Sequence, residues 1–527
     1  MAVFGIDLGT TYSCIAYVDD TGRPTVLRNL EGADTTPSAV YFESPDSVVV
    51  GATAKDTAVL EPDLVVELIK REMGRHLTLQ MHGRLYTPEE ISAFILRKLA
   101  ADAEAACGLP VKDVVITVPA YFGIAERDAT RKAGEIAGLN VIDVLSEPIA
   151  AAISYGVLEP DVDRTILVYD LGGGTFDTSV ITIRDGDIQV VCTDGDHELG
   201  GVDWDERLAE YAVEAFLAQH PDASHPLDDP STVQDIRIQV EEVKKRLSVT
   251  TSRTMRVLHD GRVATVEITR EQFETLTRDL LDRTVEITRR AIDVAQQRGV
   301  THFDDVVLVG GSSKMPAVAA RLREELGFQP RLHDPDLAVA KGAARYAFEE
   351  TYRRLVASGA ANEAHNMARR AGLTPAQEDA IAARKIRTVA ARGFGVLCYS
   401  AETDSEHVVH LIHGNDPLPV EATRTFYTVY DSQEEVGVAV MEQAGSTESE
   451  RPEDNTRIAV GPISIPPGKP AGWPIDVTFR LDTSGLLQVV ATEQSTQQRL
   501  DLAIQVGGMS DEDVARSREA LARVRVS

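Results

Sequence analysis

Residues 168–181 read VYDLGGGTFDTSVI, an apolar run that is interrupted by Asp170, three consecutive glycines and Thr175. Glycine adopts backbone conformations that other residues avoid, and it lets backbone amides approach a ligand closely. A glycine turn between two strands can therefore surround phosphate oxygens. A tight hairpin without any ligand would use the same residues. The stretch predicts strand, turn and strand, with these two interpretations of the turn.

A second stretch has the same order of residues. VFGIDLGTT (residues 3–11) and LVYDLGGGT (residues 167–175) each place an aspartate, Leu-Gly and a threonine after an apolar strand. Asp7 and Asp170 lie 163 residues apart, which is too long for a solenoid repeat and favours two related lobes. Magnesium uses few carboxylates together with substrate phosphates, so both acids are candidate metal ligands. Either aspartate alone could equally be a turn-forming residue without a metal.

Length and composition restrict the class of protein. A chain of 527 residues exceeds one hydrophobic core, so we expect roughly three or four folding units. The chain is 43% hydrophobic and 26% charged, which is typical of a globular protein. The net charge of -30 disfavours general binding to nucleic acid or anionic membranes. The four cysteines form no CxxC pair, which argues against a zinc ribbon or a disulfide framework.

The N-terminal residues bear on the location of the protein. MAVFGIDLGTTYS has no basic leader and reaches an acid at Asp7, so it does not resemble a signal peptide. No apolar run approaches the ~20 residues that span a bilayer. We therefore expect a cytoplasmic protein that binds neither membranes nor nucleic acid.

Residues 1–355 form the first predicted unit. Short β-type runs alternate there with amphipathic helices, the pattern of α/β architecture. VVITV (114–118), TILVYD (165–170) and DVVLVGG (305–311) are continuous apolar runs, as expected for central strands that are covered on both faces.

The sequence pattern changes after residue 355. Residues 356–392 predict two short helices followed by a linker. Residues 393–507 alternate short β-type runs with turn clusters, which favours an all-β sandwich. Residues 508–527 predict a short helical tail that then stops.

Familiar nucleotide and hydrolase motifs are missing. The sequence has no GxxxxGK[ST], so it is not a P-loop protein, and no GxGxxG that opens a helix. His197-Glu198-Leu199-Gly200-Gly201 lacks the second histidine of a zinc-protease helix. No serine or cysteine triad motif is present either.

Seven blocks follow one another in residues 1–350. They are GIDLGTTYS (5–13), VPAYF (118–122), SEPIAAAISYG (146–156), YDLGGGTFD (169–177), LGGVDWDERL (199–208), VGGSSKMP (309–316) and DPDLAVAKGAA (334–344). In this order they resemble the ATPase domain of the 70-kDa heat-shock chaperones, which shares its fold with actin and sugar kinases. The β-rich region, with LIHGNDPLP and IPPGKPAGWPIDVTFRLDTSGLLQV, resembles the family's peptide-binding domain more loosely.

The resemblance implies a site for Mg-ATP between two lobes. It implies catalytic roles for Lys70, which matches the family's phosphate-facing lysine, for Glu147, which matches the acid near the attacking water, and for Asp170 and Thr175. Without the motifs, Lys70 would be a solvated helix lysine and Glu147 a helix cap. The implied phosphate and metal residues are Asp7, Gly9, Thr10, Thr11, Tyr12, Asp170, Gly172, Gly173, Gly174, Thr175, Asp177, Gly200 and Gly201.

The adenosine site is implied in the same way. Glu241, Lys244, Lys245 and Ser248 lie at helical spacing, although alone they would suit a charged, solvated face. Many family members have arginine at the position of Lys245, so stacking on adenine would be weaker here. The remaining implied residues are Gly310, Gly311, Ser312 and Asp336.

Two departures from the family concern the second half of the chain. A short, acid-terminated hydrophobic linker is expected by resemblance, but Arg384, Lys385, Ile386, Arg387 and Thr388 stand there. A basic linker cannot bury the same apolar contact, which puts the coupling of the two domains in doubt. Pro119 and Arg127, which match the family's relay positions, are nevertheless present.

The second departure is the lid. The family's helical lid has no counterpart in residues 508–527, so bound peptide should dissociate faster. Val436 matches the central peptide pocket, and Phe426 is a second peptide-binding candidate. Alternatively, Val436 is a sandwich core residue.

These features predict an ATP-dependent chaperone. It would use ATP/ADP and Mg²⁺, with K⁺ as a further candidate ion, and it would bind unfolded or extended polypeptides. J-domain and nucleotide-exchange co-chaperones are candidate partners. One alternative is an ATP-binding scaffold or co-chaperone dedicated to one protein. A sugar or acetate kinase is a third, although no pocket base for an acceptor is evident.

Overall fold

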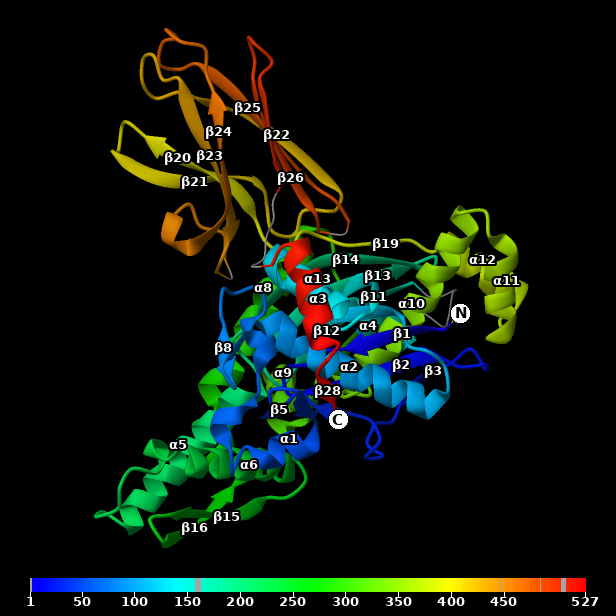
Figure 1. Ribbon diagram of the computed structural model, residues 1–527, viewed down its shortest axis with the longest axis vertical. Coiled ribbons are helices and arrows are strands. Elements are labelled where there is room, and N and C mark those ends of the chain that lie inside the picture. Colours follow the sequence, from blue (N-terminus) through cyan, green and yellow to red (C-terminus); the bar gives the residue numbers. More distant parts are fainter. Residues whose placement is uncertain (1, 157–162, 446, 484, 504–508) are drawn as a thin grey trace.

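A mixed α/β body and an all-β unit that projects from it make up the computed structural model (Figure 1). The structure describes residues 2–156, 163–445, 447–483, 485–503 and 509–527. Within these ranges no helix is long and apolar enough to cross a membrane. The predicted domain boundary between residues 507 and 508 lies outside the described residues.

Lobe I is built on a sheet in the order β11-β10-β1-β2-β3. Strand β1 pairs in parallel with β10 and antiparallel with β2, so its last residue, Asp7, lies opposite Thr117. The apolar run at residues 114–118 lies within β10, which confirms it as a central strand. The bounds are β1 (Val3–Asp7), β2 (Tyr12–Val18), β3 (Pro24–Leu27), β4 (Thr36–Pro37, paired with β2), β10 (Asp113–Val118) and β11 (Asn140–Ser146).

Lobe II repeats this arrangement with the order β18-β17-β12-β13-β14-β19. Strand β12 pairs in parallel with β17 and antiparallel with β13, so Asp170 lies opposite Val309 and Asp177. The same pairing around β1 and β12 confirms the two related lobes that the sequence predicted. The bounds are β12 (Arg164–Leu171), β13 (Phe176–Arg184), β14 (Asp187–Asp196), β17 (Asp305–Val309), β18 (Arg331–Leu332) and β19 (Ile386–Arg387).

Two helices, α4 (Glu147–Gly156) and α10 (Ala338–Ala357), pack against each other between the lobes. Part of their contact is made by backbone. A Cβ atom on Gly342 would lie 1.7 Å from the carbonyl oxygen of Ala150, so no larger residue fits there. Similarly, a Cβ atom on Gly5 would lie 2.1 Å from the amide nitrogen of Ala344. The phosphate-loop strand β1 is thereby held directly on α10.

The remaining elements of the α/β body cover the two sheets and form the outer parts of the lobes (Figure 1). A small sheet in the order β28-β6-β5-β7 belongs to lobe I, with β28 at Arg525–Val526. The bounds are β5 (Val40–Ser44), β6 (Ser47–Val50), α1 (Ala52–Thr57), β7 (Val65–Val66), β8 (Leu79–Met81), β9 (Arg84–Tyr86), α2 (Pro88–Cys107), α3 (Ile124–Ile136), α5 (Gly201–Gln219), α6 (Pro230–Leu247), β15 (Ser252–His259), β16 (Arg262–Thr269), α7 (Arg270–Leu276), α8 (Arg278–Gln297) and α9 (Pro316–Leu326), with 3₁₀ turns at 62–64, 69–72, 226–228 and 311–314. A further 3₁₀ turn, at 452–454, belongs to the all-β unit.

The all-β unit contains two four-stranded antiparallel sheets, β21-β20-β23-β24 and β22-β25-β26-β27. Alternate apolar residues of both sheets share one core, among them Val440 of the first and Phe479 of the second. The bounds are β20 (Phe394–Ser400), β21 (Ser405–Ile412), β22 (Val420–Tyr427), β23 (Glu435–Gln443), β24 (Asn455–Ser464), β25 (Pro474–Leu481), β26 (Leu487–Glu493) and β27 (Arg499–Ala503).

The basic linker lies on lobe II, where one apolar residue, Ile386, packs against a hydrophobic core. Two helices, α11 (Ala361–Arg370) and α12 (Pro375–Ala383), pack beside α10 and lead into it. Arg384 then donates from Nη1 to both carboxylate oxygens of Glu349, at 2.7 Å each, and β19 pairs with β14. The side chain of Glu349 is 0% exposed. Polar contacts and strand pairing therefore add to a small apolar contact at the linker.

Helix α3 joins the all-β unit to lobe I. Glu442 on β23 accepts a hydrogen bond from the backbone N–H of Ile124 (3.2 Å), the first residue of α3. Arg392 bridges Glu126 (Nη2 to Oε1, 2.9 Å) and approaches Glu442 (3.9 Å). The predicted relay residue Arg127 lies on the same helix, where it donates to the carbonyl oxygen of Val144. A buried charge cluster thus lies at the junction.

Glu442 predicts a pH dependence of stability. Burial raises its pKa to about 7; the nearby Arg392 opposes this shift and Glu126 adds to it. Because the folded state binds a proton that the unfolded state releases, the contribution of Glu442 to stability falls as pH rises from about 4.5 to about 7. Glu442→Gln should remove this slope, a difference of about 3 kcal/mol across the window. Urea unfolding at several pH values checks it.

The exposed Glu435 on the same strand supplies the control. Glu435→Gln should keep the slope of the wild-type protein. Parallel curves for the wild type and Glu442→Gln would contradict the role of the buried carboxyl.

The C-terminal segment docks on lobe I. The sequence predicted its helix but not the strand that follows. Helix α13 (Asp511–Leu521) begins at a capping box formed by Ser510 and Asp513 and packs against α3. The chain then forms β28 (Arg525–Val526), which pairs in parallel with β6. Pairing to a distant strand gives no periodic pattern in so short a stretch, which explains why the sequence did not predict it.

Candidate functional site

A cavity of about 910 Å³ lies between lobes I and II. Its wall includes the turns that follow β1 and β12, together with residues of α6. Most of the residues predicted from the sequence meet there. Those that line it are Asp7, Gly9, Thr10, Thr11, Tyr12, Lys70, Glu147, Asp170, Gly172, Gly173, Thr175, Glu241, Lys244, Lys245, Ser248, Gly310, Gly311, Ser312 and Asp336.

Acidic groups dominate the floor of the cavity. Burial, with the nearby Glu147, raises the pKa of Asp7 to about 7, and burial raises the pKa of Asp170 well above its usual value. Buried carboxyl groups with a raised pKa ionise only when positive charge lies nearby, and Lys70 supplies a single positive charge for them. Among the described residues, no three His, Cys, Asp or Glu side chains could hold a metal by themselves. The site therefore fits a magnesium ion that completes its coordination with phosphate oxygens and water.

Asp177 lies behind the cavity wall instead of in it. Its carboxylate accepts a hydrogen bond from the backbone N–H of Tyr121 (3.0 Å), and burial raises its pKa to about 8. The hydroxyl of Tyr121 in turn donates to the carbonyl oxygen of Gly445 in the all-β unit. A single residue thus connects the acidic floor with the all-β unit.

Lys70 and Glu147 form a buried ion pair at the cavity. Lys70 Nζ lies 2.7 Å from Glu147 Oε1, and the two side chains are 6% and 9% exposed. Burial alone would lower the pKa of Lys70, but Glu147 and Asp7 raise it. The lysine is therefore charged, and it is positioned beside both acids of the floor.

The two glycine turns touch each other across the cleft. A Cβ atom on Gly173 would lie 2.2 Å from Thr11 Oγ1, and one on Gly174 would lie 2.4 Å from Thr10 Cγ2. Gly200, which precedes α5, packs on Gly174 with similar closeness. Gly174, Gly200 and Gly201 thus form a second layer behind the lining residues, and their lack of a side chain lets the turns meet.

Helix α6 supplies one wall at the far side of the cavity. Lys245 pairs with Glu241 (2.6 Å) and donates to the hydroxyl of Tyr12 (2.9 Å) from a position over its ring. Lys244 points to the start of α5, where it pairs with Asp205 (2.6 Å). Two lysines of one helix therefore have different neighbours, and only Lys245 contacts lobe I.

Four contacts that the sequence did not single out also position the site. Thr117 donates to Asp7 (3.2 Å), and Lys244 is held by Asp205. Lys55 of α1 forms an ion pair with Glu241 of α6 and so crosses the cleft. Lys55 lies in a stretch without a motif, so only its position in the fold identifies it.

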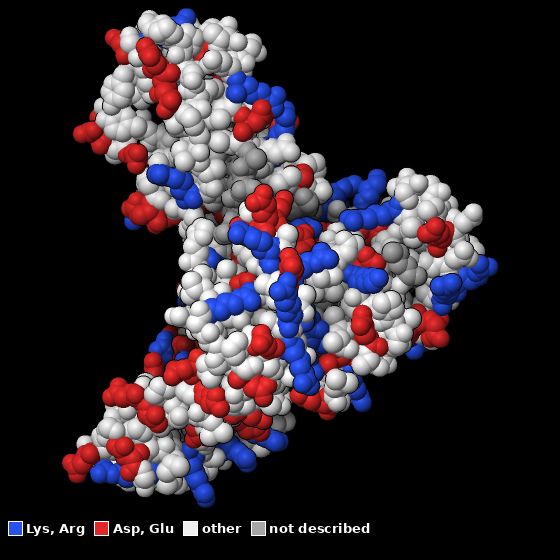
Figure 2. All heavy atoms as spheres, viewed as in Figure 1, with Lys and Arg blue, Asp and Glu red and all other residues white. Residues whose placement is uncertain are grey.

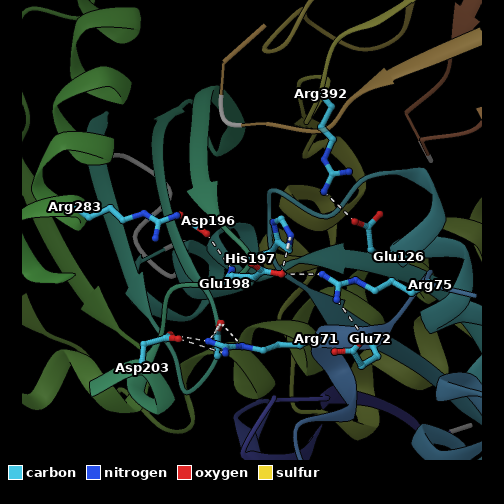
Figure 3. A network of polar contacts seen from close by, with 11 residues as sticks. Arg71, Glu72, Arg75, Glu126, Asp196, His197, Glu198, Asp203, Arg283 and Arg392 are labelled. Atoms are coloured by element: carbon cyan, nitrogen blue, oxygen red, sulfur yellow. Dashed lines mark hydrogen bonds and ion pairs between the residues drawn. The ribbon is translucent and has the colours of Figure 1, made fainter. Parts of the chain in front are cut away.

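Arg71 makes the fourth of these contacts and ties lobe I to the glycine turn that follows β12. It donates from Nε and Nη2 to the carbonyl oxygen of Gly174 (3.0 and 2.8 Å) and pairs with Asp203 (2.7 Å). Figure 3 shows Arg71 and Arg75 reaching from one lobe toward acids of the other, with Glu198 bound by Arg75 (2.8 Å). Several ion pairs therefore link the lobes around the cavity.

The two peptide-binding candidates lie outside this cavity. Phe426 is on β22 and Val436 is on β23, so they belong to opposite sheets of the all-β unit. Both are partly buried and pack against the sandwich core. Their role in binding peptide stays a prediction.

Comparison with known protein families gives one match that covers most of the chain. A family model described as "Hsp70 protein" matches residues 3–348 and 380–523. The first range contains every residue predicted for the cavity, and the second contains the all-β unit. Residues 349–379, which include α11 and the start of α12, fall between the two matched ranges.

Proposed function

The chain belongs to the Hsp70 family, and from this premise we propose that it hydrolyses Mg-ATP to control its contact with unfolded or extended polypeptides. The observation that carries the proposal is the cavity between the lobes, where two glycine turns, two strand-end aspartates and the Lys70–Glu147 pair meet. J-domain and nucleotide-exchange co-chaperones and a cytoplasmic location belong to the same proposal.

The residues present define a route for hydrolysis. The amides of the two turns and the hydroxyls of Thr10, Thr11 and Thr175 would hold the phosphates, with Lys70 beside the transferred group. When bound, magnesium would neutralise charge on the phosphates. Glu147 is positioned by Lys70 and would orient the attacking water. Such a reaction needs alignment and charge neutralisation and no covalent intermediate.

A dedicated scaffold is the second candidate. The basic linker favours a protein that binds ATP and one partner only. The complete set of cavity residues favours the ATPase. The two differ in what the all-β unit binds, because a chaperone holds many extended apolar peptides.

Two measurements on the wild-type protein test the proposal. We expect ATP turnover that is lost on adding EDTA, and binding of many apolar peptides on an array. ADP production without peptide binding would favour the scaffold, and ADP production that rises with small alcohols would favour a sugar or acetate kinase. Absence of ADP production would overturn the ATPase proposal.

Lys55 predicts a change in the rate of nucleotide release. The Lys55–Glu241 pair crosses the mouth of the cleft, and Glu241 has its pKa lowered to about 2 because the nearby Lys55 and Lys245 outweigh burial. Lys55→Ala should speed release of a fluorescent ADP by roughly five-fold, the effect of losing about 1 kcal/mol from a partly buried pair. Stopped-flow fluorescence measures the rate.

The exposed Lys112 provides a charge-matched control for this variant. Lys112→Ala should leave the release rate unchanged. Equal rates for Lys55→Ala and the wild type would show that the pair does not restrain the cleft.

A further inference from the structure

Two short helices, α11 and α12, are not used by the proposed function. They lie in or overlap residues 349–379, which fall between the two ranges that the family model matches. Figure 1 shows these added helices at the outer edge of the α/β body, and no residue of 361–383 lines the cavity between the lobes. Any effect that they have on the site must therefore pass through the elements that they contact.

The inner face of the added helices is buried, and their outer face is polar. Five buried apolar residues join the core that α4 and α10 share. Within residues 361–383 no large apolar side chain is exposed, and Figure 2 shows basic and acidic side chains beside each other over these helices. The outer face therefore lacks an apolar surface for a partner, and the informative contacts are on the inner side. The buried residues are Ala364, Met367, Ala368, Ala371 and Ile381.

The segment between α11 and α12 packs on the turn that joins β2 to β3 in lobe I. A Cβ atom on Gly22 would lie 2.6 Å from the carbonyl oxygen of Ala371 and 3.4 Å from Leu373 Cδ2. In the other direction, a Cβ atom on Gly372 would lie 3.4 Å from the carbonyl oxygen of Asp20. The two turns therefore meet through their backbones, and the glycine in each permits this approach.

The β2–β3 turn is stiffened by the side chain of Asp19. Its Oδ1 accepts hydrogen bonds from the backbone N–H of Thr21 (2.8 Å) and of Arg23 (3.2 Å). Its Oδ2 accepts a hydrogen bond from the hydroxyl of Thr25 (2.8 Å), the second residue of β3. A turn that is bonded in this way moves together with the strands that it joins.

Helix α10 holds the same turn from beneath. Arg345 donates from Nη1 to the carbonyl oxygen of Gly22 (3.2 Å), and its guanidinium is paired with the buried Glu349 (2.7 Å). Because α11 and α12 also pack beside α10, the helix and the added segment together fix the turn in place.

Strand β2 connects this turn with the first glycine turn. Its first residue, Tyr12, follows Thr10 and Thr11, and its last residue, Val18, precedes the β2–β3 turn. The strand is paired with β1 and with β3, so it moves as part of a closely packed sheet. A displacement at the β2–β3 turn therefore reaches the cavity, roughly 23 Å away for a strand of seven residues.

The surface between β2 and α10 is made of small side chains. Cys14 and Ala16 of β2 pack with Ala340 and Ala344 of α10. Small side chains interlock little, so this surface opposes sliding of the sheet along the helix only weakly. The contacts at the end of the strand then have a large influence on where its other end lies.

We propose that the added helices position the first glycine turn. By holding the β2–β3 turn against α10, they fix the far end of β2 and thereby the places of Thr10, Thr11 and Tyr12 in the cavity. Residues 371–373 are positioning residues in this arrangement, since they lie outside the cavity and act through β2. The inference rests on the proposed function for the identity of the ligand that the glycine turn receives.

Gly22→Ala tests the proposal on the full chain with Mg-ATP. The new methyl group would displace the carbonyl of Ala371 and with it the β2–β3 turn. We expect kcat to fall by at least about ten-fold while KM changes by less than about three-fold, because the α6 residues proposed to hold adenosine stay in place. A steady-state kinetic comparison at varied ATP gives both constants.

Gly32→Ala is the matched control. The φ angle is 82° at Gly32 and 75° at Gly22, but a Cβ atom on Gly32 meets no atom within 4 Å. The control should lose a similar amount of stability through its backbone conformation. Its kcat should stay within about two-fold of the wild type. Equal kcat values in the two variants would overturn the proposal.

A second set of variants acts from the side of the added helices. Leu373→Ala removes the side chain that lies over Gly22, whereas Leu355→Ala removes a partly buried leucine of α10 that packs on the same core. Leu373→Ala should lower kcat by about three-fold or more, Leu373→Met should restore it, and Leu355→Ala should leave it unchanged. An unchanged kcat in Leu373→Ala would overturn the positioning role of this contact.

Hydrogen exchange separates this inference from the proposed function. A thermal shift on adding Mg-ADP reports whether nucleotide binds at all. If none binds, the ATPase proposal fails, and the Gly22 amide, which donates to the carbonyl oxygen of Asp19 (3.1 Å), still reports on the turn. In nucleotide-free protein its exchange should be at least about five-fold faster in Leu373→Ala than in Leu355→Ala. Equal exchange would overturn the inference, and the ATPase proposal would stand if the wild type turns over ATP.

Discussion

Replacing Lys70 by alanine is expected to reduce Mg-ATP turnover by at least about 100-fold, the typical cost of removing one preorganised charge that stabilises a transition state. Lys70 lies beside Asp7, Asp170 and Glu147, so the variant loses both the charge that we propose faces the phosphates and the partner that positions Glu147. Single-turnover measurements at saturating ATP check this expectation, because they separate the chemical step from nucleotide release.

A second buried lysine that also forms an ion pair with a carboxylate provides the control. Lys98 pairs with Asp102 (2.8 Å) in α2, where both side chains are buried and lie away from the cavity. Lys98→Ala should lower stability as Lys70→Ala does, because each leaves a buried carboxylate unpaired. It should not slow turnover per folded molecule. If both variants turn over ATP like the wild type, Lys70 is only a structural ion-pair partner.

Replacing Glu349 by alanine is expected to lower the free energy of unfolding by about 3–5 kcal/mol, the usual cost of breaking a buried ion pair. Glu349 is 0% exposed and binds Arg345 (2.7 Å) and Arg384 (2.7 Å), so both guanidinium groups would lose their counter-charge. The variant should also expose the linker, because Arg384 anchors its start. Thermal unfolding and tryptic cleavage at residues 384–387 measure the two effects.

The neighbouring Glu350 provides the control for this experiment. Its carboxylate is partly exposed and pairs with Arg353 and Arg354 on the surface of α10. Glu350→Ala should cost under about 1 kcal/mol and leave the linker protected. Equal cleavage of the Glu349→Ala and Glu350→Ala variants would show that the buried pair does not hold the linker.

The part of the site that could be predicted from the sequence itself is the pair of similar turns. An aspartate, glycines and a threonine at a strand end are local features, so both glycine turns and their positions after β1 and β12 could be predicted. Lys70 and Glu147 required the family resemblance. They lie 77 positions apart, and nothing in either stretch indicates that their side chains meet at 2.7 Å.

The contacts that could not be predicted connect distant segments. Lys55 and Glu241 are 186 positions apart, and Arg97 meets Leu521 across 424 positions. The basic linker illustrates the same limit in another way. Its basic composition indicates that its contact is not wholly apolar. Its acidic partner, Glu349, could not be predicted, because no local pattern in α10 indicates that this residue is buried. Charge and hydropathy of one segment do not specify what it faces.

The close approach of α4 and α10 has a consequence for movement between the lobes. Where helices interlock through large side chains, a small rotation forces those side chains into new rotamers. Gly342 meets the backbone of Ala150 directly, and Gly5 meets that of Ala344, so no side chain projects at these two points, although α4 and α10 also share core residues such as Ile149 and Tyr346. Helices in contact through small residues can slide and turn by small amounts at little cost. The backbone contacts at Gly342 and Gly5 therefore ease small movements locally, whereas the ion pairs at the rim of the cleft oppose movement to a degree that depends on ionic strength.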